Sequence, residues 1–392
     1  MRARSAQIFD YVAAGKSPYF SLNLGALHDC ADFVDDVTAR HYPNGEIPYH
    51  SRWRHFEVGA RDRWADWCSD HPEINSAERS RTAIDLAVVS VLLDAGAGPD
   101  WRYRESASGS VYARSEGLAV ASFDWFNTGG FSSTGDHQVD ADALMRLTVS
   151  HLRHAFQVTA HNPLLGCEGR VALLNRLGGR LRERLGPGAR SAPRIADLFK
   201  AFTDRPAGST INAAAILGCV LSALGPIWPN AVTIDGVTMG DVGRHSALTD
   251  PGPTRGWVPF HKLSQWLTYS LIEPLESACL TLSAIDNLTG LPEYRNGGLF
   301  IDCDVLRVRQ PVLLAESQSV HSEPIVEWRA LTVTLLDRLA ERIRQRRGLD
   351  SAQLPLARIL QGGTWNAGRE LAATHRADAS PPIRLHSDGT VF

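Results

Sequence analysis

Apolar residues recur every three to four positions over most of the chain, a spacing that predicts a mainly helical protein. The clearest case follows Asn75. Asn75 and Glu78 have the spacing of a capping box, an apolar run comes next, and Gly96 stands where a helix would end. Asp140 is expected to begin a second helix, DADALMRLTVSHLRHAFQV. A third is expected over LLGCEGRVALLNRLGGRLRERL, ending at the loop of residues 186–193.

The second half of the chain adds a few short strands to the helical pattern. Two β-branched runs, VTI and VTM, flank an Asp-Gly pair that begins at Asp235, which is a strong signal for a hairpin. A long helix is expected over about 259–285, with a bend at Pro274 because proline removes a backbone hydrogen bond. The last strong helix is expected to begin near Glu323 and to end in the basic run RLAERIRQRRG.

Neither an internal repeat nor a long linker divides the 392 residues. We therefore expect one continuous domain over 1–392, mainly α-helical with a few short strands and a hairpin. Its N-terminal helical lobe would cover about 1–190 and its C-terminal lobe about 194–375. Residues 206–234 carry no charge, but their prolines, glycines and polar side chains favour a buried helix over a membrane span.

Composition narrows the classes of function. The net charge of −3 argues against a general nucleic-acid-binding protein. The six cysteines are widely spaced and the N-terminus lacks an apolar signal segment, so we expect a reduced, cytoplasmic protein. The simple signatures of nucleotide, dinucleotide and zinc sites are missing, and we expect no cofactor. Only three of the 40 basic residues are lysines, which makes the position of Lys262 informative.

The helix FHKLSQWLTYSLIEPLE, which contains that lysine, has two distinct faces. One is an apolar stripe, while the other carries Lys262, Gln265, Trp266 and Tyr269 together. A cation, an amide and two large aromatic side chains suit a cleft that binds an anionic group, hydroxyl groups and a sugar or planar group. The alternative is an ordinary half-exposed helix whose lysine reaches into solvent.

The segment LTGLPEYRNGGLFID presents Glu293, Tyr294 and Arg295 together and is expected to be a turn or loop between a helix and a strand. A carboxylate near a lysine and an arginine stays ionised at neutral pH, because opposite charge favours its charged form. Such a carboxylate can stabilise developing positive charge and orient a water molecule. The alternative is a glutamate that caps a helix, beside a surface arginine.

Two further segments contribute polar groups. HSEPIVEWRALTV places Glu327 one helical turn after Glu323, and on a different face from Arg329. SRWRHF places His55 beside two arginines, which is a weak signal by itself in so arginine-rich a chain. The SRWRHF segment is a candidate for completing the wall of a pocket.

The nearest approach to a metal pattern is formed by His151, His154 and His161, which fall near one helical face with Cys167 and Glu168 just beyond them. Histidines on helices are usually structural. We therefore expect no resident metal.

Several of these segments together resemble the uracil-catabolism protein family of bacteria and fungi. The resemblance runs in order over nearly the whole chain and rests on SRWRHFE, DLAVVSVLLDAGAGPDWRY, RSEGLAVASFDWF, the IDG hairpin followed by GDVGRH, VPFHKLSQWLTYSLIEPLE, GLPEYRNGGL and VEWRALTV. It implies a pathway that converts uracil to a nucleotide, opens the pyrimidine ring and releases urea.

A more distant resemblance adds chemistry. Lys-x-x-Gln on a helix, then acid-Tyr-Arg, then acid-x-Arg-Ala on another helix is similar to the queuosine-salvage glycohydrolases. That resemblance implies a helical fold related to DNA glycosylases and cleavage of a base from a ribonucleoside 5′-monophosphate. Those proteins carry Asp-Tyr-Arg where this chain has Glu293, Tyr294 and Arg295, so the substrate geometry is expected to differ.

The resemblance and the residues together imply hydrolysis of an N-ribosidic bond, for example of ribosylurea 5′-phosphate to urea and ribose 5-phosphate. Glu293 would stabilise positive charge on the sugar and orient or deprotonate the water. Lys262 and Arg295 would hold phosphate or ribose oxygens, while Tyr294 and Trp266 would pack on the sugar or ureido group. The candidates are Glu293 and Asp235 as catalytic residues, and Lys262, Arg295, Tyr294, Gln265, Trp266, Tyr269, Glu327, Asp241, His245 and His55 as substrate-binding residues.

Two alternatives stay open. One is an amidohydrolase that acts on the opened ureido chain with a metal at the His151 cluster, and the other is a non-catalytic helical partner of the ring-opening enzyme. The expected ligand is a small phosphorylated riboside, with neither nucleic acid nor membrane as a partner. The oligomeric state is left open.

Overall fold

The computed structural model describes residues 1–186, 192–229 and 231–386, and its chain forms two compact units. Unit 1 consists of Met1–His50, Val232–Gln265 and Ala284–His386, and unit 2 of Ser51–Ala231 and Trp266–Ser283. The division falls within one helix, α12 (Lys262–Ser277). These two units differ from the expected lobes, because residues 1–50 belong to unit 1 together with most of the C-terminal part of the chain. The expected loop at 186–193 lies largely outside the described residues.

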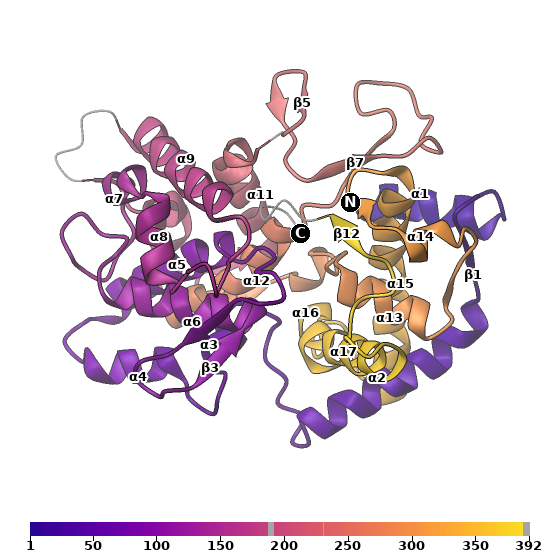
Figure 1. Ribbon diagram of the computed structural model, residues 1–392, viewed down its shortest axis with the longest axis horizontal. Coiled ribbons are helices and arrows are strands. Elements are labelled where there is room, and N and C mark those ends of the chain that lie inside the picture. The colour runs from indigo at the N-terminus through magenta and orange to yellow at the C-terminus, as the bar shows by residue number, and fades with distance from the viewer. Residues whose placement is uncertain (187–191, 230, 387–392) are drawn as a thin grey trace. The chain divides into compact units, whose positions relative to one another are not determined.

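Unit 1 is mainly helical, with short strands at its edges (Figure 1). Besides the first turn of α12, its helices are α1 (Arg2–Ala13), α2 (Leu27–His41), α13 (Tyr294–Asp302), α14 (Val312–Ala315), α15 (Glu323–Arg347), α16 (Leu356–Ile359) and α17 (Trp365–His375). Its antiparallel strand pairs are β1 (Phe20–Leu22) with β10 (Leu306–Val308), β5 (Thr233–Ile234) with β6 (Val237–Thr238), and β7 (Val242–Arg244) with β8 (Trp257–Pro259). A parallel pair joins β11 (Gln318–Ser319) and β12 (Leu385–His386).

The core of unit 1 is built around α15, against which α1, α2 and α13 pack (Figure 1). Its apolar side chains, among them Ile325 and Leu335, are fully buried. The helix begins at Glu323, has proline in its first turn, and ends before Gly348, whose φ of 63° is a left-handed conformation that suits glycine. Both ends are as predicted. The first two turns of α15 carry Glu327 and Arg329, which are buried with the rest of the helix.

Unit 2 is also mainly helical. Besides the rest of α12, its helices are α3 (Trp53–Phe56), α4 (Arg63–Asp70), α5 (Ser76–Leu92), α6 (Arg114–Asn127), α7 (Ala141–Arg146), α8 (Val149–Ala155), α9 (Cys167–Leu185), α10 (Lys200–Thr203) and α11 (Ala213–Leu224). Two strand pairs complete it: antiparallel β2 (Arg102–Arg104) with β3 (Val111–Ala113), and parallel β4 (Thr210–Asn212) with β9 (Thr281–Ser283).

Local signals predicted several ends of helices and turns correctly. Asn75 caps α5 by accepting a hydrogen bond from the Glu78 N–H (3.0 Å), although the helix ends at Leu92, before Gly96. The hairpin of β5 and β6 is confirmed, and its two turn residues, Asp235 and Gly236, both have positive φ (48° and 78°). These features depend on a few neighbouring residues. The mainly α-helical fold class is confirmed as well.

Two predicted helices are wrong in extent. The helix expected from Asp140 is two helices, α7 and α8, because the chain becomes extended at Leu147 and Thr148 caps a new helix. The helix expected over 259–285 is α12, which ends at Ser277. Cys279 then adopts a left-handed conformation (φ 60°), and residues 281–283 form β9. Tertiary pairing of β9 with β4 therefore outweighs the local helical pattern.

The uncharged stretch 206–234 contains β4 and the helix α11. None of the helices described for this chain is both long enough and apolar enough to cross a membrane.

Candidate active site

Asp241 joins two strands to the start of α12 in unit 1. It precedes β7, and its backbone carbonyl accepts the N–H groups of Phe260 and His261 across the pair with β8 (both 3.1 Å). Its carboxylate accepts the N–H of Lys262 (3.0 Å), the first residue of α12. A carboxylate is favourable there, because the first N–H groups of a helix lack partners and carry partial positive charge. Asp241 thereby fixes where Lys262 begins its helix.

Arg329 on α15 donates a hydrogen bond to each oxygen of that carboxylate, with Nη–O distances of 2.9 and 2.7 Å. Its guanidinium also lies over the Phe260 ring, 4.1 Å from the centroid, and its Nε–H donates to the carbonyl of Pro292 (3.4 Å). Burial alone would raise the pKa of Asp241, but the charge and hydrogen bonds of Arg329 outweigh burial and lower it. Asp241 therefore stays ionised, and Arg329 links it to the segment that carries Glu293.

His261 lies between β8 and α12 in a strained conformation. Its φ is 50°, in the left-handed region, and its side chain is only 9% exposed. The ring Nδ1 is buried without a hydrogen-bond partner in the described part of the chain. Burial lowers the pKa of His261, the nearby Asp241 opposes the shift, and Arg329 adds to it, which favours the neutral ring. A strained backbone and an unsatisfied buried nitrogen together make His261 a candidate for contact with a ligand.

Glu293 is the N-cap of α13. Its carboxylate accepts the N–H groups of Arg295 (2.7 Å) and Asn296 (2.5 Å), one on each oxygen. The expected loop is therefore a helix from Tyr294 onward. Glu293 does cap this helix, but Arg295 is buried and is not the surface arginine of that alternative. Burial raises the pKa of Glu293, while those two hydrogen bonds and the charges of Lys262 and Arg295 oppose the rise. The net shift is upward, opposite to the direction that nearby cations alone would give.

The Lys262 ammonium is the cation that connects these groups. It is half-buried and close enough to Glu293 to oppose the rise in that pKa. Burial lowers the pKa of His50 to about 4; a hydrogen bond with Gln361 opposes this shift and Lys262 adds to it. Lys262 therefore lies near a carboxylate with raised proton affinity and near a histidine that stays neutral.

Arg295, which follows Glu293 in the chain by two positions, is already bound within the protein. The Arg295 guanidinium is buried, donates to the carbonyl of Ala379 (2.9 Å) and lies 5.3 Å from the centroid of the Tyr294 ring. Tyr294 itself is 37% exposed. Among these three adjacent residues, Glu293 has both the burial and the charge environment of a reacting group.

His245 and Glu327, two candidates 82 positions apart in sequence, are in direct contact in unit 1. The His245 Nε2 lies 2.9 Å from a carboxylate oxygen of Glu327, and its Nδ1 accepts the Ala247 N–H (3.1 Å). With Nδ1 as an acceptor, the imidazole donates to Glu327 through Nε2. The second oxygen of Glu327 accepts the Ser17 hydroxyl. Because all these atoms are paired and buried, this trio holds α15, β7 and the N-terminal segment together.

The other candidates are placed as follows. Gln265 is fully buried in unit 1, where its amide oxygen accepts the Thr289 N–H (3.3 Å) and its nitrogen lies 3.0 Å from the Met1 sulfur. Trp266 and Tyr269 belong to unit 2 and are buried, so the polar-aromatic stripe of α12 does not form a solvent face. Asp235 is exposed at the tip of the β5–β6 hairpin, where its backbone forms the turn.

His55 is part of a buried cluster in unit 2. Arg52 Nη1 lies 3.0 Å from Asp94 and donates to His55 Nδ1 (3.1 Å), and the Ser115 hydroxyl donates to Asp94 (2.7 Å). Arg52 is fully buried, and its guanidinium lies 5.7 Å from the centroid of the Trp266 ring. Arg52 and Asp94, which come from separate segments of the chain, are therefore paired, and they fix the orientation of His55.

Three residues near the site were not among the sequence candidates. Nothing in the sequence distinguishes His50 and His261 from the single histidines that are common in cores. Arg329 is the arginine of the acid-x-Arg-Ala pattern, but helical geometry turns it away from Glu327. Glu327 and Arg329 do contact different partners, but those partners, His245 and Asp241, flank the same short strand, β7.

The structure also bears on the metal alternative. Within residues 1–186, 192–229 and 231–386, no group of three or more His, Cys, Asp or Glu side chains is arranged to hold a metal ion. His151, His154 and His161 are all described, so they do not form the ligand set that this alternative requires.

Unit 1 combines the buried Glu293 carboxylate, the Lys262 ammonium that influences its pKa, and the ion pair of Asp241 and Arg329. Glu293 is held by two backbone N–H groups, yet each carboxylate oxygen keeps a second lone pair. A fixed carboxylate of raised pKa can accept a proton and release it again, and it can stabilise a cation that forms beside it. The Lys262 ammonium can bind an anionic part of a ligand.

Comparisons with known proteins extend over the whole chain. A family model described as "Protein of unknown function (DUF1688)" matches residues 1–392. The chain is 38% identical over 403 residues to "Protein urg3" of Schizosaccharomyces pombe, covering 100% of this chain and 96% of the relative. It is 36% identical over 432 residues to "Uracil catabolism protein 4" of Lachancea kluyveri, covering 100% and 97%.

Proposed function

We propose that the chain acts in uracil degradation, because it belongs to the family described as a protein of unknown function (DUF1688) and because a relative that matches all of this chain is named a uracil catabolism protein. We further propose that it hydrolyses the N-ribosidic bond of a ring-opened pyrimidine nucleotide such as ribosylurea 5′-phosphate. The observation that carries this proposal is the buried Glu293 carboxylate, which two backbone N–H groups fix and whose pKa the charge of Lys262 influences.

In the proposed reaction, the bond between the sugar C1′ and the ureido nitrogen breaks and water adds its oxygen to C1′. The sugar carries positive charge in the transition state, as in other glycoside hydrolyses. The Glu293 carboxylate stabilises that charge and accepts a proton from the attacking water. It then returns the proton to the departing ureido nitrogen, which leaves as urea. The raised pKa of Glu293, caused by burial, suits a group that must both take up and release a proton.

Lys262 is proposed to hold the phosphate or the ribose oxygens, since an ammonium is a compact cation that binds such groups well. Asp241 and Arg329 contribute by position rather than by contact with the reacting atoms, because each is satisfied by the other. His261, neutral and strained beside them, is a further candidate for contact with the sugar hydroxyls.

We expect the purified protein to release urea from ribosylurea 5′-phosphate without any added metal. The measurement is free urea over time, detected through urease, with boiled protein and substrate alone as blanks. Ribosylurea without the phosphate is expected to react more slowly, because Lys262 would lose its anionic partner. If the native, folded protein yields no urea above the blanks, the glycohydrolase assignment fails for this substrate.

The pH dependence of that reaction provides a second prediction. The rate requires ionised Glu293, and burial raises its pKa, so kcat/KM should fall as the pH drops through a midpoint above the ordinary value of 4.5. Lys262→Met removes a positive charge that opposes the rise in pKa, so its midpoint should lie at still higher pH. A midpoint at or below 4.5, or a downward shift in Lys262→Met, would contradict the role of Glu293. The profile is measured as initial urea release from pH 4 to pH 9.

A further inference from the structure

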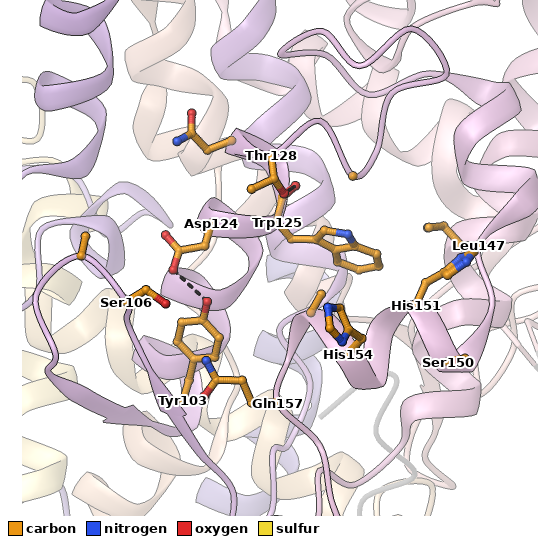
Figure 2. Close-up of a pocket in the computed structure, with 14 residues that line it drawn as sticks. Tyr103, Ser106, Asp124, Trp125, Thr128, Leu147, Ser150, His151, His154 and Gln157 are labelled. Carbon is orange, nitrogen blue, oxygen red and sulfur yellow. Dashed lines mark hydrogen bonds between the residues drawn. The ribbon is translucent and has the colours of Figure 1, made fainter.

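A large open pocket lies in unit 2 (Figure 2). Its volume is about 1010 Å³, which falls at the upper end of the range for small-molecule sites. It is formed by β2, the C-terminal half of α6, the following loop and α8. None of the sequence candidates for the glycohydrolase site lines it. Its lining includes an aromatic ring, a carboxylate and two histidines.

The aromatic ring is the half-buried indole of Trp125. Phe131 and Phe156 support it from within unit 2, at centroid distances of 4.3 and 5.9 Å. Gly130 lies so close that a Cβ atom there would come within 2.1 Å of the indole, so the missing side chain makes room for the ring. Figure 2 shows the indole in the middle of the pocket. A ring that is held in this way offers a fixed flat surface for stacking.

One wall of the pocket is the pair of Asp124 and Tyr103. The Tyr103 hydroxyl donates to Oδ2 of Asp124 (2.8 Å), and Tyr103 is only 5% exposed, so the carboxylate has one orientation. For Oδ1 of Asp124, the described residues provide no hydrogen-bond partner. Burial raises the pKa of Asp124, and the Tyr103 hydrogen bond opposes the rise. This wall therefore presents a fixed acceptor for an N–H group.

His151 and His154, one helical turn apart on α8, lie away from that wall in Figure 2. The His151 Nδ1 accepts the Thr148 N–H at the start of α8 (3.4 Å), which leaves the proton on Nε2. His151 is thus a donor through Nε2. The pocket combines an acceptor, a donor and a flat apolar surface, which are the complements of a ring with N–H groups, carbonyl groups and a flat face.

We propose that this pocket binds a flat, uncharged heterocycle that carries both ring N–H and ring C=O groups, of the uracil type, as a free base or a nucleoside. Its ring stacks on Trp125, a ring N–H donates to Asp124, and a ring carbonyl accepts from His151. The volume leaves room for a ribose beside the base. The site is separate from Glu293 and Lys262 and does not depend on the hydrolysis proposed above.

The test is calorimetric titration of the native protein with uracil, uridine and 1,3-dimethyluracil. We expect saturable binding of uracil or uridine. 1,3-Dimethyluracil has the same ring and carbonyls but no N–H, so its affinity should be at least 10-fold lower. Trp125→Ala should weaken uracil binding about 10-fold or more through loss of stacking. These titrations need no turnover, so their outcome is independent of the urea assay.

Two further variants keep the test decisive if Trp125→Ala does not fold. Asp124→Asn preserves the shape of the wall and the Tyr103 hydrogen bond but turns an N–H₂ group toward the ligand, and should weaken uracil binding about 5- to 10-fold. His151→Ala should weaken it through loss of the proposed donor, whereas His161→Ala, an exposed histidine outside the pocket, should not. Equal binding of 1,3-dimethyluracil, unchanged affinity in Asp124→Asn, or no saturable binding of any of the three ligands would overturn the proposal.

Discussion

Replacement of Glu293 by glutamine is expected to reduce kcat for urea release by about 10³-fold or more while the protein still folds. Glutamine has nearly the same shape, and its amide oxygen can still accept one of the two N–H groups that the carboxylate accepts from Arg295 and Asn296. It cannot take a proton from water or stabilise a cation with a full negative charge. The measurement is urea release under saturating substrate, with thermal unfolding recorded in parallel.

The role of Glu293 as a helix cap must be separated from its proposed chemical role. Loss of one cap hydrogen bond costs about 1 kcal/mol of stability. Asn75→Ala removes a comparable cap, that of α5, and should lower stability by a similar amount with kcat unchanged. Glu341→Gln is the matched control for charge, because this glutamate is exposed on α15. If Glu293→Gln retains more than a tenth of wild-type kcat, Glu293 is a cap and not a catalytic residue.

Arg329→Met is expected to lower the free energy of unfolding by about 3–5 kcal/mol, because it leaves the Asp241 carboxylate without its cation. The two side chains are largely buried, with 5% and 15% of their surfaces exposed. The control is Arg342→Met, because Arg342 is an exposed arginine on the same helix. This variant should change the free energy of unfolding by about 0.5 kcal/mol or less. Denaturant titration monitored by circular dichroism measures both.

The double variant Asp241→Asn with Arg329→Met should be more stable than Arg329→Met alone, since no buried charge is left unpaired. In the wild type the pKa of Asp241 is lowered, so its ionised form contributes stability that is lost only as the pH falls through that low value. In Arg329→Met, burial raises the pKa of Asp241, because the arginine that opposed this shift is missing. The difference in the free energy of unfolding between Arg329→Met and the wild type should therefore become smaller as the pH drops from 7 towards 5. A gap that is constant over this range, or a cost equal to that of Arg342→Met, would contradict the ion-pair account.

Sequence patterns predicted those parts of the fold that depend on neighbouring residues. The cap at Asn75, the turn at Asp235 and the ends of α15 at Glu323 and Gly348 all follow from chemistry within about four residues. The break between α7 and α8 was missed, because Thr148 competes with a continuous helical pattern. The end of α12 was missed because β9 pairs with β4, some 70 residues earlier in the chain.

The candidate site was predictable in its residue types but not in its arrangement. Glu293 and Lys262 were identified from charge and from the scarcity of lysine, and they do lie near each other. The aromatic face expected from Trp266 and Tyr269 is buried in unit 2, because periodicity gives the face of a helix and not what packs against it. His261 was missed because neither its left-handed backbone nor its unpaired Nδ1 can be read from a single sequence.

The short strand β7 has a consequence for how this sequence can change. Asp241 stands just before it and His245 just after it, and both are tied to α15, through Arg329 and Glu327. An insertion or deletion of one residue within 241–245 would move either Asp241 away from Arg329 or His245 away from Glu327. Buried polar groups would then lose their partners. The β5–β6 hairpin immediately before it has an exposed turn at Asp235 and bears no such constraint. Viable length variants are therefore expected in the hairpin and not in the five residues that follow Gly240.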